Sequence, residues 1–444
     1  MRTLAPGGAV RVIGANAVAK VAVMGVSGVL AVITTRLIIQ YFGVDPYAQY
    51  GLLTSMAALV PFADLGMSAA IINVVASSDS PRTDDAVRRT LVSAFRVLLG
   101  SAVTLAAIGV LLTVLGLWPA VLGQGLLVGG SIAAMLCVLV FAMTLPLGVG
   151  QRVLTGLGKN HVQILTQALA APFILVVVVL LIALGAQAQN YLAVVAYLAS
   201  AVVALTALLI AAKYLKPQIS GAIRMIPKVH SYRGVNVMSV AWPMLMQMLA
   251  LPVALQTDRL LLSHLGSSAE LAQYNLGSQL FGLITQTIAA SAVALWPMFA
   301  KARSADQIRS PFKLTGGFVA GGFVLAVTLA GLLPLVTPLI SDGKIALDNW
   351  LVFGFVAFVV AQAAKYPLGM YMTDLRGLRF QVIPIFLMVP VNLGLSWLLV
   401  APLGAAGPII GSAVSVTLFQ VIPNFWYVRR DLHRRRLGTD RVGV

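Results

Sequence analysis

Twelve long apolar runs, separated by short polar connections, make up almost all of this 444-residue sequence. They cover residues 12–41, 48–76, 91–116, 121–149, 162–184, 190–212, 235–264, 271–299, 314–340, 349–373, 381–400 and 404–428. A helix needs about 20 predominantly apolar residues to cross the hydrocarbon core of a bilayer, and each run is long enough. The short alternating segments of a membrane β-barrel are absent from the sequence. The pattern therefore predicts an all-α polytopic membrane protein with about 12 transmembrane helices.

The composition excludes a large soluble protein. Hydrophobic residues make up 59% of the chain and charged residues 10%, whereas soluble domains carry about 25% charged residues. The net charge of +17 does not indicate a nucleic-acid binder, because the basic residues lie in short connections between apolar runs.

The distribution of basic residues predicts the orientation. Lys and Arg are concentrated in the N-terminal segment, the even-numbered connections and the C-terminal tail, while the odd-numbered connections carry only Lys344. The positive-inside rule then places both termini in the cytoplasm. Tryptophans are predicted to anchor the helix ends, with Trp118, Trp350 and Trp397 outside and Trp242, Trp296 and Trp426 inside.

An internal repeat divides the chain into halves. Residues 35–43 resemble residues 258–266, and Ala48-Gln49-Tyr50 matches Ala272-Gln273-Tyr274 after a slip of one residue. Because six helices are an even number, the halves should form a parallel pseudo-twofold repeat of two six-helix lobes around a central cavity. The predicted parts are an N-terminal lobe (1–212), a basic cytoplasmic linker (213–234), a C-terminal lobe (235–428) and a basic cytoplasmic tail (429–444).

Seven ionisable residues fall at membrane depth. They are Lys20, Arg36, Asp64, Arg96, Asp258, Arg259 and Lys365. Each costs a few kcal/mol if it faces lipid, so such residues usually face a bundle interior or a water-filled cavity. The cations outnumber the carboxylates, and the excess predicts a cavity that is complementary to an anionic substrate.

The predicted substrate-binding residues come from both halves. Arg36 and Arg259 occupy equivalent repeat positions and are expected to face one another across the cavity. Lys20 and Lys365 would extend the positive field towards the cytoplasm, and Gln256 supplies an amide on the seventh helix. Arginine suits an anionic substrate because it is always charged and can bind a carboxylate or a phosphate with two parallel hydrogen bonds.

Asp64 and Asp258 are the ion-coupling candidates, since they are the only carboxylates predicted at this depth. Structural roles are the alternatives: Asp258 pairing with Arg259, Asp64 capping a helix break, and Arg96 and Lys20 extending to the headgroups.

No catalytic or metal-binding constellation is present, so neither an enzyme nor a cofactor is expected. The four histidines are scattered without metal-ligand spacing, and there is no phosphate-binding loop. Gly316-Gly317 and Gly321-Gly322 lie within a span and are expected to permit close helix packing.

Short motifs resemble the Wzx-type polysaccharide flippases of the multidrug/oligosaccharidyl-lipid/polysaccharide exporter (MOP) superfamily. They are Arg36-Leu-Ile-Ile-Gln-Tyr-Phe-Gly43 with Tyr50-Gly51, Ala63-Asp64-Leu65-Gly66-Met67, and Asp258-Arg259-Leu-Leu-Leu with Tyr274. The related lipid II flippases have 14 helices and an Arg-Asp pair in the first helix, whereas here Leu37 follows Arg36 and no additional helix pair is found.

The resemblance implies a two-lobed transporter with a cationic cavity lined largely by the first and seventh helices. Such proteins move polyprenyl-pyrophosphate-linked oligosaccharides from the cytoplasmic to the outer leaflet by alternating access, for O-antigen or exopolysaccharide synthesis. The expected location is the bacterial inner membrane. The expected partners are the lipid-linked oligosaccharide, membrane lipids, a polysaccharide polymerase and glycosyltransferases, with no nucleic acid.

Two other functions stay open from sequence alone. A cation-coupled drug or metabolite exporter of the same superfamily should have acidic residues in its cavity. A membrane-embedded glycan polymerase or ligase should have a substantial outer loop, and the predicted outer loops here are short.

Overall fold

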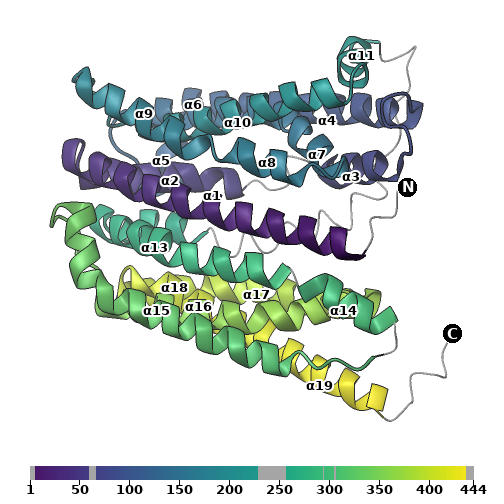
Figure 1. The fold of residues 1–444 in the computed structure, drawn as a ribbon. Coiled ribbons are helices and arrows are strands. Elements are labelled where there is room, and N and C mark those ends of the chain that lie inside the picture. The colour runs from purple at the N-terminus through teal and green to yellow at the C-terminus, as the bar shows by residue number, and fades with distance from the viewer. Residues whose placement is uncertain (1–5, 60–66, 229–256, 294, 305–306, 437–444) are drawn as a thin grey trace. The chain divides into compact units, whose positions relative to one another are not determined.

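The structure is a computed structural model that describes residues 6–59, 67–228, 257–293, 295–304 and 307–436. Within these ranges the regular structure is helical throughout (Figure 1). The chain forms two compact units, Met1–Leu249 and Ala250–Val444.

Unit 1 is a bundle of long helices with shorter helices at their ends. Its elements are α1 (Pro6–Tyr41), α2 (Val44–Leu59), α3 (Met67–Ser77), α4 (Asp85–Val114), α5 (Trp118–Leu122), η2 (Gly123–Gly125), α6 (Gly130–Leu147), α7 (Val149–Gly156), α8 (Asn160–Gln167), α9 (Ala170–Ala183), α10 (Leu192–Tyr214) and α11 (Gln218–Met225). Small residues let these helices approach closely. A Cβ at Gly150 of α7 would lie 2.3 Å from the backbone of Leu208 in α10.

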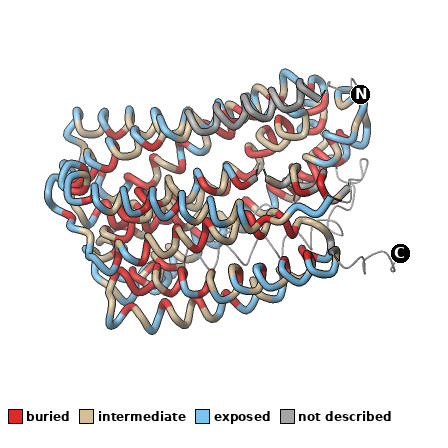
Figure 2. The backbone as a smooth tube through the Cα atoms, turned by 60° about the horizontal axis from the view of Figure 1, so that its bottom comes forward, coloured by how far each residue is buried: buried red, intermediate tan, exposed pale blue. Residues whose placement is uncertain are grey.

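The core of unit 1 joins α3, α4, α6, α7, α10 and α11. Leu91 of α4, Val153 of α7 and Ala211 of α10 are among its fully buried members. The outward faces are apolar as well, as at Val103, which is 68% exposed in the middle of α4. Exposed residues recur along the lengths of the helices and not only at their ends (Figure 2). Exposed apolar surface of this kind fits a helix bundle surrounded by lipid.

The predicted linker, 213–234, contains the helix α11, which packs on the N-terminal part of α4. Arg96 of α4 donates from Nε to the Ile226 carbonyl (3.0 Å) and from Nη2 to the Met225 carbonyl (2.8 Å). Arg96 therefore binds the free carbonyls at the C-terminal end of α11. The sequence predicted that Arg96 extends to the lipid headgroups, whereas in the structure it caps α11.

Unit 2 contains a helical segment at 257–265, followed by longer helices. The latter are α13 (Ser268–Val293), α14 (Leu295–Ser304), α15 (Phe312–Ser341), α16 (Asn349–Tyr371), α17 (Leu375–Leu403), α18 (Ala406–Val416), η3 (Thr417–Val421) and α19 (Ile422–Arg436). The element η3 is a π-helical turn, and α18, η3 and α19 follow one another without a break. Buried Gln420 of this turn donates from Nε2 to Met388 Sδ (2.8 Å).

Nine helices in the described part of the chain are long and apolar enough to cross a membrane. They correspond to nine of the twelve predicted runs, and the count of twelve stays a prediction. The run 48–76 is divided between α2 and α3, and most of 235–264 lies outside the described residues. The run 271–299 corresponds to α13 and α14, and α13 carries many polar residues, which lower its hydropathy.

Two expectations about individual residues are corrected. Trp118 is only 1% exposed and donates from Nε1 to Thr113 Oγ1, so it packs inside unit 1 instead of anchoring a surface, whereas Trp350 is 59% exposed. Gly321 does not mediate close packing, since a Cβ there would meet nothing within 4 Å. The same is true of Gly316 and Gly317, and only Gly322 of these four packs closely, against Ala363.

Candidate functional site

The two repeat segments fold in the same local way. In unit 1, α1 ends at Tyr41 and α2 begins at Val44; in unit 2, the helical segment ends at residue 265 and α13 begins at Ser268. Gly43 has a φ of 106°, which allows the sharp turn between the helices. Arg36 and Arg259 each lie near the C-terminal end of the first helix in such a pair.

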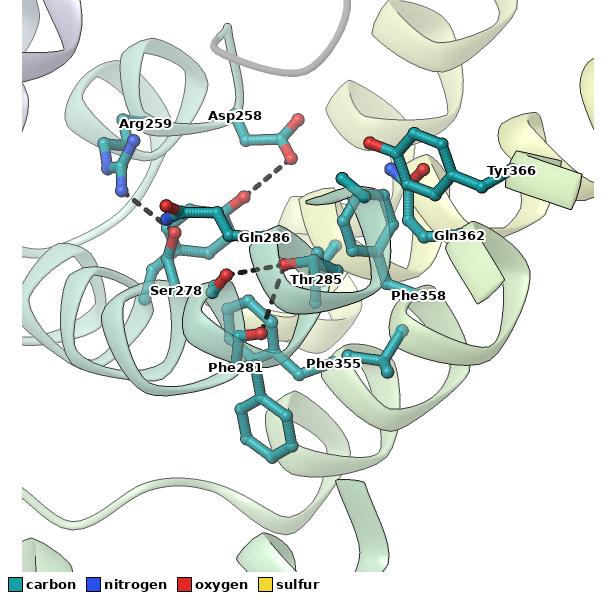
Figure 3. A pocket seen from close by; sticks show the side chains of 15 residues that line it. Asp258, Arg259, Ser278, Phe281, Thr285, Gln286, Phe355, Phe358, Gln362 and Tyr366 are labelled. Atoms are coloured by element: carbon teal, nitrogen blue, oxygen red, sulfur yellow. Dashed lines mark hydrogen bonds between the residues drawn. The ribbon is translucent and has the colours of Figure 1, made fainter. Parts of the chain in front are cut away.

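Arg259 is held by the helix that follows it. Its Nε donates to Asn275 Oδ1 (2.7 Å), and its Nη2 donates to Ser278 Oγ (3.0 Å), both on α13. Its guanidinium carbon also lies 5.8 Å from the centroid of the Tyr274 ring. These contacts give the half-buried guanidinium a defined direction (Figure 3).

Arg36 has a different environment. It is exposed, on the same face of α1 as Gly25 and Val29, as the helical period predicts. Within the described part of unit 1 it makes no hydrogen bond or ion pair. The repeat accounts for part of the difference, because the position equivalent to Asn275 is Gly51, which has no side-chain carbonyl to accept a hydrogen bond.

Asp258 lies in a buried polar network beside Arg259 and is 2% exposed. Its Oδ2 accepts hydrogen bonds from the Tyr274 hydroxyl (2.7 Å) and from Ser412 Oγ (3.0 Å), whereas Oδ1 has no partner. Ser412 Oγ also lies 3.2 Å from Asn392 Oδ1. One hydroxyl hydrogen serves one acceptor at a time, so Ser412 does not donate to Asp258 and Asn392 together. A proton or a cation would give Asp258 Oδ1 a partner.

A cavity of about 420 Å³ opens beside these residues within unit 2. Asp258, Arg259 and Tyr274 line one part of it. The other walls come from α13, through Ser278, Gly282, Thr285 and Gln286, and from α16, through Phe355, Phe358, Gln362 and Tyr366. Figure 3 shows the α13 and α16 side chains extending from two neighbouring helices.

Lys365 belongs to the α16 side of this region. It is half-buried, and its Nζ lies 4.7 Å from the centroid of the Tyr366 ring. Because Tyr366 lines the cavity, Lys365 is next to the wall without being part of it.

Gln256 and Asp64 lie outside the described residues, and the side chain of Lys20 is likewise not described. The structure therefore brings together Asp258 and Arg259, with Lys365 near the same cavity.

The sequence interpretation missed the neutral polar residues of the cavity. Ser278, Gln286 and Gln362 carry no charge, so a survey of ionisable residues did not find them. The available signal was the spacing of four residues between polar and aromatic positions in two apolar runs, as in Phe358, Gln362 and Tyr366.

The family follows from a sequence profile described as "Polysaccharide biosynthesis protein", which matches residues 9–303. The chain belongs to the polysaccharide biosynthesis protein family. The matched part of this family member includes Arg36, Asp258, Arg259 and all of α13. No curated protein sequence matches the chain.

Solved structures share the fold of this polysaccharide biosynthesis family member. An inward-facing MATE multidrug resistance transporter of the MOP superfamily has a TM-score of 0.65 at 14% identity, covering 95% of this chain and 99% of that one. The lipid II flippase MurJ in an inward closed conformation has a TM-score of 0.63 at 14% identity, covering 94% and 89%. The Vibrio cholerae MATE transporter VcmN in the bent form has a TM-score of 0.55 at 15% identity, covering 96% and 99%.

The family match and the shared fold confirm the resemblance inferred from the short motifs. The protein is an all-α, multi-pass membrane protein with the fold of MOP-superfamily transporters. The similar structures are described as transporters and a flippase.

Proposed function

We propose that this protein is a flippase that translocates a polyprenyl-pyrophosphate-linked oligosaccharide from the cytoplasmic to the outer leaflet by alternating access. The observation that carries the proposal is Arg259, a permanent cation oriented by Asn275 and Ser278 at the edge of a polar cavity. Membership of the polysaccharide biosynthesis protein family supports a glycan substrate. The protein acts in the bacterial inner membrane with both termini cytoplasmic, and a polymerase and glycosyltransferases are its functional partners.

The pyrophosphate is the part of the substrate that the cations bind. Arg36 and Arg259 contact it in the transport cycle, while Lys20, Lys365 and Gln256 contribute charge and an amide along the path. A cation without a fixed partner is costly at membrane depth unless water or a bound anion solvates it. Exposed Arg36, without a partner in the described part of unit 1, fits such a role.

Asp258 and Asp64 couple transport to an ion gradient. The unpartnered Oδ1 of Asp258 supports this role, because a buried carboxylate oxygen in this position is stabilised by a proton or a sodium ion. The same observation favours the second candidate function, a cation-coupled drug or metabolite exporter. The flippase is preferred because the chain belongs to the polysaccharide biosynthesis protein family, and because Arg259 offers a fixed cation for a phosphate beside the carboxylate of Asp258 in the cavity wall.

The test is export of surface glycan by cells whose only copy of this protein carries both Arg36→Ala and Arg259→Ala. We expect a loss of at least tenfold, since a hydrogen bond to a charged group contributes about 1.5–3 kcal/mol. Arg→Lys at both sites should also impair export, because Lys retains the charge without the planar group.

Arg379→Ala is the control, an exposed arginine outside the cavity. All variants are compared at membrane abundance equal to wild type. Normal glycan export by the double alanine variant would refute the proposed role of the two arginines.

A further inference from the structure

The cavity in unit 2 lies between two helix faces, each with its own regular pattern. On α13, Ser278, Gly282 and Gln286 are spaced by four residues and lie on one face. On α16, Phe358, Gln362 and Tyr366 have the same spacing. The result is a groove with amide groups and aromatic rings on both sides, since α13 also contributes Phe281 (Figure 3).

The side chain of Gln362 indicates that the groove binds a ligand. Gln362 is 4% exposed, and its Oε1 has no hydrogen-bond partner. A buried polar atom without a partner costs about 1–3 kcal/mol, so the groove would be stabilised by a molecule that donates a hydrogen bond to this oxygen. Gln286, across the groove on α13, is exposed and adds a second carboxamide.

The remaining wall chemistry selects the class of ligand. Half-buried Phe358 and Tyr366 flank Gln362 and present apolar surface between polar groups. The hydroxyl of Thr285 is used within α13, where it bonds to the carbonyls of Phe281 and Gly282. A ligand with an apolar face and a rim of hydroxyl or amide donors matches this surface, and a sugar ring has that character.

We propose that this groove is a subsite for a sugar residue of the lipid-linked substrate. The sugar ring packs against Phe358 and Tyr366 and donates a hydroxyl or acetamido hydrogen to Gln362 Oε1. The volume of about 420 Å³ is within the range of about 300–1,000 Å³ that small-molecule sites occupy. This inference rests on the proposed function, in which Arg259 binds the adjoining phosphate.

Gly282 provides a way to fill the groove without disturbing the fold. A Cβ at this position would meet nothing within 4 Å, although the residue lines the cavity. Leucine at this position would occupy the space proposed for the sugar. Its helix propensity is higher than that of glycine, so α13 should keep its helical structure. Gly321 of α15 is the matched control, because it also faces open space and lies outside the cavity.

The experiment measures binding to the full chain in lipid nanodiscs by native mass spectrometry. The probes are farnesyl pyrophosphate and three farnesyl pyrophosphates linked to N-acetylglucosamine, glucose or galactose. The variants are Gly282→Leu, Gln362→Leu, Arg259→Ala and the control Gly321→Leu.

We expect wild type to bind at least one sugar-linked probe tenfold or more tightly than farnesyl pyrophosphate. Gly282→Leu and Gln362→Leu should remove that preference and leave the affinity for farnesyl pyrophosphate unchanged, whereas Gly321→Leu should keep it. Arg259→Ala should weaken all the probes alike.

Equal binding of sugar-linked and sugar-free probes by wild type would overturn the subsite. So would a preference that survives both Gly282→Leu and Gln362→Leu. Failure of the proposed function gives a different result, namely farnesyl pyrophosphate binding that does not depend on Arg259. Wild type that binds no probe would overturn both.

Discussion

Asn275 accepts a hydrogen bond of 2.7 Å from Nε of Arg259, and the first half of the chain has Gly51 in the equivalent position. The two repeat arginines therefore differ in freedom, although their helices end alike. Arg259 is oriented within unit 2 before any ligand binds. Arg36 has no such partner in the described part of unit 1 and keeps more of its side-chain entropy, so the two residues should respond differently to changes nearby.

Loss of the Asn275 amide should reduce transport without removing a charge. Asn275→Leu takes away the acceptor of Arg259 Nε, and we expect roughly tenfold lower glycan export, corresponding to about 1.4 kcal/mol. Thr287→Val, on an exposed position of the same helix, is the control and should export normally. Equal export by Asn275→Leu and wild type would show that the orientation of Arg259 is unimportant.

Removal of the buried carboxylate should uncouple transport from its driving ion. In Asp258→Asn, the unpartnered oxygen no longer carries the charge that would bind a proton or sodium ion. We expect export to lose its dependence on the proton or sodium gradient, measured after each gradient is collapsed separately. Asp342→Asn, in an exposed turn, should behave as wild type.

The coupling prediction has a clear counter-result. If the double variant Asp64→Asn and Asp258→Asn transports normally and still depends on the gradient, neither carboxylate couples transport to the ion.

The orientation of unit 1 can be tested on α11. Ser220 is exposed, whereas the single cysteine, Cys137, is buried in α6. With Ser220→Cys in a Cys137→Ala background, a membrane-impermeant maleimide should label the protein only after the cells are permeabilised. Labelling in intact cells would reverse the predicted topology.

The stability of the first turn of α4 should depend on pH. The Ser78 hydroxyl and the Ala86 N–H donate to Asp84, and these hydrogen bonds lower the pKa of this carboxyl below its ordinary value of 3.8. The ionised form is thus favoured in the folded state. The stabilisation is complete above the ordinary pKa and is lost as the pH falls through the lowered one.

Hydrogen–deuterium exchange of residues 85–90 measures this effect. Wild type should lose protection relative to Asp84→Asn as the pH falls below about 4, because Asn also caps the helix but does not titrate. A constant difference between the two proteins across this range would contradict the prediction.

The fold class and the charged part of the site were predictable because each depends on one residue or one run at a time. An arginine or aspartate inside an apolar run, such as Arg259 or Asp258, is conspicuous because burial of its charge is costly. The cavity wall was not predictable in this way. Gln362 and Gln286 carry no charge and lie on different helices, so neither run alone shows that both line one cavity.

Wrong expectations about single residues have the same physical origin. Arg96 has the reach to extend to the headgroups, but α11 returns to α4 and presents carbonyls to it first. Trp118 has the character of an interfacial anchor, yet the short connection α5 turns it inward. Glycines allow close packing only where another helix is present, which holds for Gly322 and not for Gly321.

The π-helical turn η3 changes the angle between the side chains that precede it and those that follow it in the last long helix. A π-turn bonds residue i to i+5 and so takes up one more residue than an α-turn. A helical wheel drawn at 100° per residue through 406–435 would therefore misplace Trp426 and Arg430 by about 100° relative to α18. The side chains after η3 therefore point as they would in a plain α-helix with one residue fewer. Removal of one residue within 417–421 would restore plain α-helix and leave the faces on both sides pointing as before, so this is a point where the length of the chain can change without redirecting its side chains.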